Sequence, residues 1–220
     1  MPFAVVAREA VRRALAFVRR ETGLLAILCL VALALLGFLS VADEVTEGES
    51  LALDETLMLA LRAPGDSHDP LGPRWLEEAA RDITALGGTT VVTLVTLAVI
   101  GFLVMNGRPR TAGLVVVSVG GGMLLSTLLK LGFARPRPDL VPHAVEVYTA
   151  SFPSGHATAA AVVYLTLGGL LSWSQKRRRV RIYILALAVA LTAMVGVSRI
   201  YLGVHWPTDV LAGWCVGAAW

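Results

Sequence analysis

The sequence predicts an all-α integral membrane bundle of six transmembrane helices, with amphipathic interfacial helices between the first two spans. The first observation is composition: 56% of the 220 residues are hydrophobic and the mean hydropathy is +0.71, which excludes an ordinary water-soluble domain. The second is that several uncharged runs reach the roughly 20 residues that a helix needs to cross a hydrocarbon core about 30 Å thick. Because these runs do not alternate between polar and apolar residues, they exclude a membrane β-barrel.

The expected spans cover approximately residues 22–42, 83–105, 111–130, 156–174, 182–198 and 207–220 of one domain, residues 1–220. The first resembles a secretory signal, since Arg19 and Arg20 precede it, but it is longer than a usual signal core and is expected to be retained. The last, about 21 Å long as a helix, is short for a full crossing, so we expect the natural chain to continue past Trp220. Gly213 and Gly217, four residues apart, are expected to let two helices approach closely.

The segment between the first two spans, residues 43–82, is acidic and contains two amphipathic pieces separated by the turn-rich stretch 64–73. We expect two helices that lie on the outer membrane surface and pack on the bundle. The alternative is a rim that guides a lipid headgroup to the site. The residues that share a face are Leu51, Leu53, Leu57, Met58 and Leu61 in the first piece and Trp75, Leu76, Ala79, Ala80 and Ile83 in the second.

Positive charge is concentrated on one side of the expected membrane. Short cytoplasmic loops carry the excess of Lys and Arg, so this side is predicted to be the cytoplasm, with the amino terminus inside. Topology and anionic lipid explain the cluster at 176–181 better than nucleic acid does, and no nucleic-acid partner is expected. Two lysines against 17 arginines suggest a GC-rich bacterial genome, and hence a bacterial inner membrane. The twelve cations on this side are Arg8, Arg12, Arg13, Arg19, Arg20, Arg108, Arg110, Lys176, Arg177, Arg178, Arg179 and Arg181.

Four of the seven remaining cations lie near the outer ends of spans: Lys130, Arg135, Arg137 and Arg199. An acidic outer surface has little reason to collect cations at the mouths of three spans unless something anionic binds there. Ionisable residues at membrane depth indicate a functional site. A proline follows Arg135 and another follows Arg137, so this loop is extended and cannot continue the third span.

Two further segments bring histidines to the same face. Pro153-Ser154-Gly155-His156 opens the fourth span, where the serine suits a helix cap and the helix amino terminus suits a phosphate. Ser198 and Arg199 close the fifth span. His205 and Asp209 are four residues apart, the spacing that puts both side chains on one helix face.

These residue types are the parts that phosphoryl transfer needs. One histidine can attack phosphorus while the other protonates the leaving oxygen. A carboxylate can hold the attacking imidazole in the correct tautomer and stabilise its charged form. The planar fork of arginine binds phosphoryl oxygens in pairs, and lysine adds a point charge. No carboxylate cluster suggests a divalent metal, so no cofactor is expected.

The spacing Lys130-(six residues)-Arg137-Pro138, the segment 153–156, and Ser198-Arg199-(five residues)-His205-(three residues)-Asp209 together resemble the three-part signature of the type-2 phosphatidate phosphatase family, which includes the vanadium haloperoxidases. The resemblance implies a metal-independent phosphatase that acts through a phosphohistidine. By that resemblance His205 is the nucleophile, Asp209 orients it, and His156 is the general acid and later the base. The phosphate-binding residues that it implies are Lys130, Arg137, Ser154, Gly155 and Arg199, with Arg135 and Ser198 as further candidates.

We therefore expect a lipid phosphate or lipid pyrophosphate as substrate and membrane lipids as surroundings. The motifs do not separate phosphatidate, phosphatidylglycerol phosphate, undecaprenyl pyrophosphate and similar lipids, and they leave the oligomeric state open. The two rival functions are a haloperoxidase-like enzyme that holds vanadate and a non-enzymatic protein that binds or transports an anionic lipid. His143 and Glu146, between the motifs, are expected to be solvated loop residues.

Overall fold

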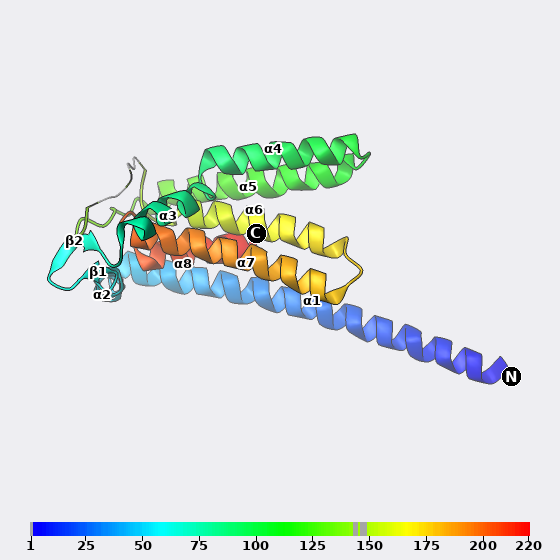
Figure 1. Ribbon diagram of the computed structural model, residues 1–220. Helices are drawn as coiled ribbons and strands as arrows, with labels where there is room; N and C mark the ends of the chain where they lie inside the picture. Colours follow the sequence, from blue (N-terminus) through cyan, green and yellow to red (C-terminus); the bar gives the residue numbers. More distant parts are fainter. Residues whose placement is uncertain (1, 143–144, 146–148) are drawn as a thin grey trace.

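A computed structural model describes residues 2–142, 145 and 149–220 of the chain (Figure 1). His143 and Glu146 lie outside the described residues, so their expected solvation stays a prediction. The described part is mostly helical, with one short two-stranded sheet. The elements are α1 (Pro2–Glu47), α2 (Leu51–Leu59), β1 (Arg62–Ala63), β2 (Asp66–Pro70), α3 (Arg74–Ala85), α4 (Thr89–Met105), α5 (Pro109–Phe133), α6 (Gly155–Trp173), α7 (Arg178–Tyr201) and α8 (Pro207–Ala219).

The long helices run side by side, and α2, the β-hairpin and α3 gather at one end of the bundle (Figure 1). Helix α6 is central, because it packs against α4, α5, α7 and α8, while α1 packs mainly against α8. The apolar core between α4, α5 and α6 includes Val92, Val115, Val162 and Val163, each at most 3% exposed. The helices are apolar on several faces and bury only part of this apolar surface against one another. Valines and alanines fill the buried part.

Glycines set the distance between α8 and α6. A Cβ atom on Gly213 would lie 2.8 Å from the carbonyl oxygen of Ser154, and one on Gly217 would lie 2.5 Å from the Cβ of Ala161. Both distances are shorter than any ordinary contact, so only glycine permits this approach. The expected role of the Gly213 and Gly217 pair is confirmed.

Within the described residues, four helical stretches are long and apolar enough to cross a membrane: Glu21–Glu47, Pro109–Phe133, Gly155–Trp173 and Arg178–Tyr201. Helices α3 and α4 are long and apolar enough only when taken together, and they are bent by 47° at the break between them. The expected span at 83–105 includes this break, because residues 83–85 end α3 and α4 begins at Thr89. The break coincides with Gly87, whose Cα lies so close to α6 that a Cβ there would be 2.8 Å from the carbonyl oxygen of His156.

The segment between α1 and α4 contains the two expected helices, but one detail differs. The turn-rich stretch 64–73 includes the antiparallel pair β1 and β2. In α2 the buried side chains are Asp54 and Met58, whereas Leu51, Leu53 and Leu57 are 43–56% exposed. Of the residues expected to share one face, Met58 is therefore buried against the bundle, while these three leucines stay exposed. The carboxylate of Asp54 faces inward because it contacts Arg135 and the start of α8.

Candidate active site

Three chain segments that are far apart in the sequence meet at the end of the bundle near α2 and α3. They are the loop after α5, the start of α6, and the connection from α7 to α8 (Figure 1). Helix α5 ends at Phe133 and is capped by Ala134, which adopts a left-handed conformation with φ 46° and donates its N–H to the carbonyl oxygen of Lys130. The two prolines that follow keep the chain extended, so that it runs across the start of α8.

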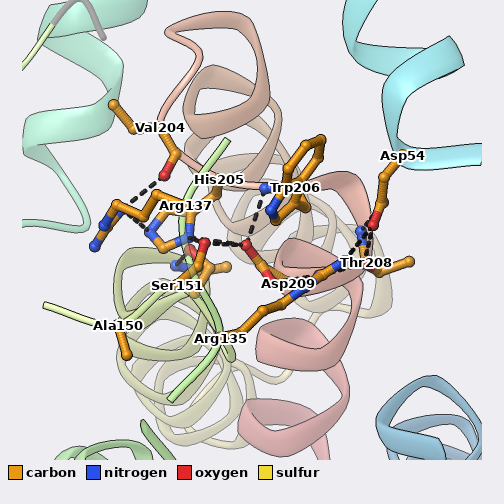
Figure 2. Close-up of polar contacts among 12 residues, drawn as sticks. Asp54, Arg135, Arg137, Ala150, Ser151, Val204, His205, Trp206, Thr208 and Asp209 are labelled. Carbon is orange, nitrogen blue, oxygen red and sulfur yellow. Dashed lines mark hydrogen bonds and ion pairs between the residues drawn. The ribbon is translucent and has the colours of Figure 1, made fainter. Parts of the chain in front are cut away.

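The centre of the site is the pair formed by His205 and Asp209 (Figure 2). His205 lies directly before α8, and the carboxylate of Asp209, in the first turn, folds back to accept the backbone N–H of Trp206 at 2.9 Å. The same oxygen, Oδ2, accepts a hydrogen bond from the hydroxyl of Ser151 and lies 3.3 Å from Nδ1 of His205. The spacing of four residues thus brings the two side chains together, although His205 itself precedes the helix.

The contacts of His205 define its tautomer. Its Nε2 lies 3.2 Å from Nη1 of Arg137, which also donates to the carbonyl oxygen of Val204 at 2.6 Å. Because a guanidinium can only donate, Nε2 must carry the lone pair and Nδ1 the proton, which points toward Asp209. Burial lowers the pKa of His205 to about 3, although the hydrogen bond and the charge of Asp209 act in the opposite direction. The imidazole is therefore neutral near pH 7, with a free electron pair on Nε2.

Two further cationic side chains lie at this end of the bundle. Lys130 donates from Nζ to the carbonyl oxygen of Ala150 at 2.6 Å, and Arg199 donates from Nη1 to the hydroxyl of Thr84 on α3 at 3.1 Å. Arg199 is 3% exposed, and its Nε has no hydrogen-bond partner among the residues that the structure describes. A buried N–H without a partner costs free energy unless a ligand accepts it. The arrangement therefore suits an anion.

His156 belongs to the same electrostatic cluster, since it interacts with His205, Arg199, Arg137 and Lys130. It is the second residue of α6 and is half-buried. A Cβ atom on Gly88, in the break between α3 and α4, would lie 3.7 Å from its Nε2. The predicted positions of both histidines and the three cations are thus brought to one region of the fold.

The start of α6 is held by its own cap. The hydroxyl of Ser154 accepts the N–H of Ala157 at 3.4 Å, and the N–H of Ser154 donates to the carbonyl oxygen of Asp209 at 2.9 Å. A Cβ on Gly155 would lie 3.3 Å from Cε of Lys130, so the glycine lets the lysine pass. Ser198, by contrast, donates its hydroxyl to the carbonyl oxygen of Val195 in its own helix. The hydroxyl hydrogen of Ser198 is therefore donated within α7.

Arg135 does not join the cationic cluster around His205. Its Nη1 donates to Oδ1 of Asp209 at 2.7 Å and its Nη2 donates to Oδ2 of Asp54 at 2.8 Å, with only 8% of the side chain exposed (Figure 2). Arg135 therefore lies behind the His205 and Asp209 pair, where its donors are occupied by carboxylates. Its proximity in the sequence to Arg137, the arginine predicted to bind phosphate, concealed this difference.

Four residues that the motifs do not include contact candidate site residues: Asp54, Ser151, Thr84 and Thr208. Ser151 lies three residues before Ser154, and its position beside the motif is the one signal that could have indicated it. Asp54 interrupts the apolar positions of an otherwise leucine-rich helix, but only the folded chain shows what the carboxylate meets. Among the described residues, no group of three or more His, Cys, Asp or Glu side chains is arranged to hold a metal ion.

The helical fold, the apolar spans and the buried histidine in a cationic pocket together define an integral membrane protein built to act on an anion. Residues 111–220 match the family model of the PAP2 superfamily, and the chain belongs to that superfamily. A crystal structure of a transmembrane PAP2-type phosphatidylglycerolphosphate phosphatase from Bacillus subtilis superposes with a TM-score of 0.78 at 28% identity, covering 86% of this chain and 91% of that one.

Two further relatives are named lipid phosphatases. Phosphatidylglycerophosphatase B of Bacillus subtilis is 38% identical over 148 residues, which are 65% of this chain and 70% of the relative. Decaprenylphosphoryl-5-phosphoribose phosphatase of Mycobacterium tuberculosis is 32% identical over 142 residues, which are 63% of this chain and 73% of the relative. The expectation of a membrane phosphatase of the type-2 phosphatidate phosphatase family is confirmed by these matches.

Proposed function

We propose that this chain removes phosphate from a lipid phosphate through a covalent phosphohistidine on His205, without a metal ion. The observation that carries the proposal is the tautomer of His205: Nδ1 faces Asp209 and the lone pair of Nε2 faces the cations. A neutral imidazole whose far nitrogen is anchored by a carboxylate is the arrangement of an activated nucleophile.

In the proposed reaction, Nε2 of His205 attacks phosphorus. The N–P bond forms as the P–O bond to the lipid breaks, and His156 gives a proton to the departing oxygen. The phosphorylated imidazole is positive, and Asp209 stabilises it at Nδ1. His156 then takes a proton from water, which attacks phosphorus, breaks the N–P bond and releases inorganic phosphate.

The cations stabilise the charge that develops on the phosphoryl oxygens. Arg137, Lys130 and Arg199 donate to protein oxygens in this structure, and Nε of Arg199 has no partner within the described part of the chain. We propose that they turn donors toward the phosphoryl group, with the amide of Gly155 and the hydroxyl of Ser154 at the start of α6. Donors of this kind contribute about 3 kcal/mol each in the transition state.

Phosphatidylglycerol phosphate is the substrate to test first, because the Bacillus relatives that match most of this chain carry that name. A prenyl-linked phosphate is the second, given the Mycobacterium relative. A haloperoxidase-like activity and simple lipid binding remain the rivals, and both predict no release of phosphate from lipid.

We further propose a single domain over residues 1–220 with six crossings, in which α3 with α4 forms the second and α8 the last. The amino terminus is cytoplasmic, and the site faces outward from a bacterial inner membrane. Arg108, Arg110 and the cluster 176–181 support this, since they lie at the opposite end of the bundle from α2 and α3 (Figure 1). In this arrangement the exposed leucines of α2 contact the outer leaflet.

The test is phosphate release from phosphatidylglycerol phosphate by purified protein in the presence of a chelator. We expect wild-type activity to persist with chelator and His205→Ala to lose at least about 10³-fold in kcat, because the nucleophile is gone. His68→Ala, on the exposed hairpin, is the matched control and should keep wild-type activity. Acid-labile, base-stable phosphate on His205 after rapid quenching would identify the intermediate. Turnover by His205→Ala, or strict dependence on a divalent ion, would contradict the mechanism.

A further inference from the structure

A buried ion network connects the outer segment of the chain to the candidate nucleophile. Arg135 lies between two carboxylates, at 2.8 Å from Asp54 on α2 and 2.7 Å from Asp209 on α8. Both acids are 0% exposed. Asp54 is 155 residues from Asp209 in the sequence, and none of the three family motifs contains it.

We propose that Asp54 is a positioning residue for the reaction, which holds Asp209, and through it His205, by way of Arg135 and the start of α8. This inference rests on the proposed role of His205 as nucleophile. Asp54 touches neither His205 nor the substrate region, so its effect passes through other side chains.

The first route runs through charge. Arg135 gives one guanidinium nitrogen to each carboxylate, so that its positive charge is shared between Asp54 and Asp209. Without the Asp54 charge, Arg135 would neutralise Asp209 alone, and the carboxylate would stabilise a positive imidazole less. The network of Asp54, Arg135 and Asp209 carries one net negative charge, which suits a histidine that becomes positive when it is phosphorylated.

The second route runs through the backbone of α8. Oδ1 of Asp54 accepts the N–H of Thr208 at 2.9 Å, and Oδ2 accepts the hydroxyl of Thr208 at 2.6 Å. The N–H groups in the first turn of a helix have no partner within the helix, so a carboxylate from another element caps α8 here. Because Asp209 is the next residue, this cap fixes the turn from which its side chain reaches His205.

Neighbouring side chains restrict the movement of Arg135 between Asp54 and Asp209. The hydroxyl of Ser50 accepts from Arg135 at 3.3 Å, and the guanidinium lies 5.6 Å from the ring centre of Trp206, within range of a cation–π contact. Trp206 in turn donates its Nε1–H to the carbonyl oxygen of Pro136 at 3.2 Å. The loop after α5, the start of α8 and helix α2 are therefore joined at one point.

The test compares Asp54→Asn with Glu55→Gln, which alters an exposed acid on the same helix. Removing outer partners of positioned histidines and carboxylates typically costs about 10- to 100-fold. We expect Asp54→Asn to lower kcat by about that factor with KM within about twofold of wild type, and Glu55→Gln to change neither. In an Arg135→Gln background the Asp54→Asn substitution should lower kcat by a smaller factor than it does in the wild-type background, because the route through Arg135 is already broken and only the cap on α8 remains to be lost.

Each rate is divided by the amount of protein that forms phosphoenzyme. For a variant that traps no phosphoenzyme, the rate is divided by the amount of folded, monodisperse protein. If Asp54→Asn lowered kcat by the same factor with and without Arg135→Gln, the inference would be overturned. It would also be overturned if Asp54→Asn only reduced the amount of folded protein and left kcat per folded molecule at the wild-type value. Should Asp54→Asn not accumulate, Asp54→Glu replaces it: a lowered kcat at unchanged KM supports the inference, and a wild-type kcat overturns it. His205→Ala is measured in parallel. If it stays active, the proposed function fails; if it is inactive while Asp54→Asn behaves as wild type, only this inference fails.

Discussion

At the scale of single residues, the site is defined by which donors and acceptors remain available. Asp209 accepts four hydrogen bonds or ion pairs through its two oxygens, from Ser151, Trp206, His205 and Arg135. A carboxylate that is satisfied in this way has one orientation. It therefore presents His205 in one tautomer, with Nε2 toward the cations. Buried polar groups of this kind are stable only as a complete set.

The pH behaviour of His205 follows from its burial. Burial disfavours the imidazolium form, so the pKa falls to about 3, against about 6.5 in an unfolded chain. We expect deuterium exchange at the ring carbon of His205, followed by mass spectrometry, to show no titration midpoint between pH 5 and pH 8 in the folded protein. The urea-unfolded protein is the control and should show a midpoint near about 6.5.

The direction in which pH changes the stability of the fold follows from the number of protons that His205 binds in the folded and unfolded states. Between pH about 6.5 and about 3 the unfolded state binds more protons at this histidine than the folded state does. Lowering the pH through this interval therefore favours unfolding, and the contribution of His205 is fully retained only above about pH 6.5. A folded-state midpoint close to 6.5 would show that the imidazole is not desolvated as the structure indicates.

At the scale of elements, helix α8 is the part that joins the site to the bundle. It packs on α6 through Gly213 and Gly217, and the carbonyl oxygen of Asp209 accepts the N–H of Ser154 at the start of α6. The residues predicted to bind phosphate and the pair predicted to attack it are thus placed relative to each other by one helix contact. Close approach of the two helices is part of the site geometry.

Gly213→Val tests this contact. Its Cβ would lie 2.8 Å from the Ser154 carbonyl oxygen and 3.0 Å from the Cβ of Ala157, so α8 must move away from α6. We expect kcat to fall about tenfold or more and stability to fall by about 1–3 kcal/mol, as for other overpacked helix contacts. Gly169→Val on α6, where no atom lies within 4 Å of the new Cβ, is the control. Equal effects of the two substitutions, measured by thermal unfolding in detergent and by kcat, would contradict this account.

At the scale of the whole molecule, the two ends of the bundle differ in chemistry. The end with α2, the hairpin and α3 holds the candidate site, whereas the turns from α4 to α5 and from α6 to α7 carry arginines and Lys176 (Figure 1). Positive charge near span ends favours the cytoplasmic side. The asymmetry therefore predicts one orientation in the membrane.

Cysteine labelling tests the orientation. In a background with Cys29→Ser and Cys215→Ala, we expect His68→Cys on the hairpin to react with a membrane-impermeant maleimide added to intact spheroplasts. Lys176→Cys should react only after the membrane is permeabilised. Both positions are exposed, so accessibility within the protein does not separate them. The reverse pattern of labelling would place the site on the cytoplasmic side.

The sequence predicted most of the helical architecture because lipid imposes long apolar runs and internal backbone hydrogen bonds, and both are visible in composition. It did not show the break between α3 and α4, because Ile83 is apolar enough for lipid, while the close approach of Gly87 to the carbonyl oxygen of His156 is visible only in the folded chain. It grouped the leucines of α2 with Met58 on one face, but only Met58 is buried. The periodicity shows that α2 is amphipathic, but membrane and bundle both accept leucine, so it does not show which face turns inward.

The motifs alone were enough to predict the candidate reactive groups, because their spacing at span ends is expected to return Lys130, His156, Arg199 and His205 to one membrane face whatever the details of packing. Only the tertiary structure decided how these groups are supported. Arg135 and Arg137 are two residues apart and alike in chemistry, yet one faces His205 and the other lies between Asp54 and Asp209. The difference arises because a buried arginine pairs with the carboxylates it meets, and Asp54 reaches this point only when α2 folds onto α8.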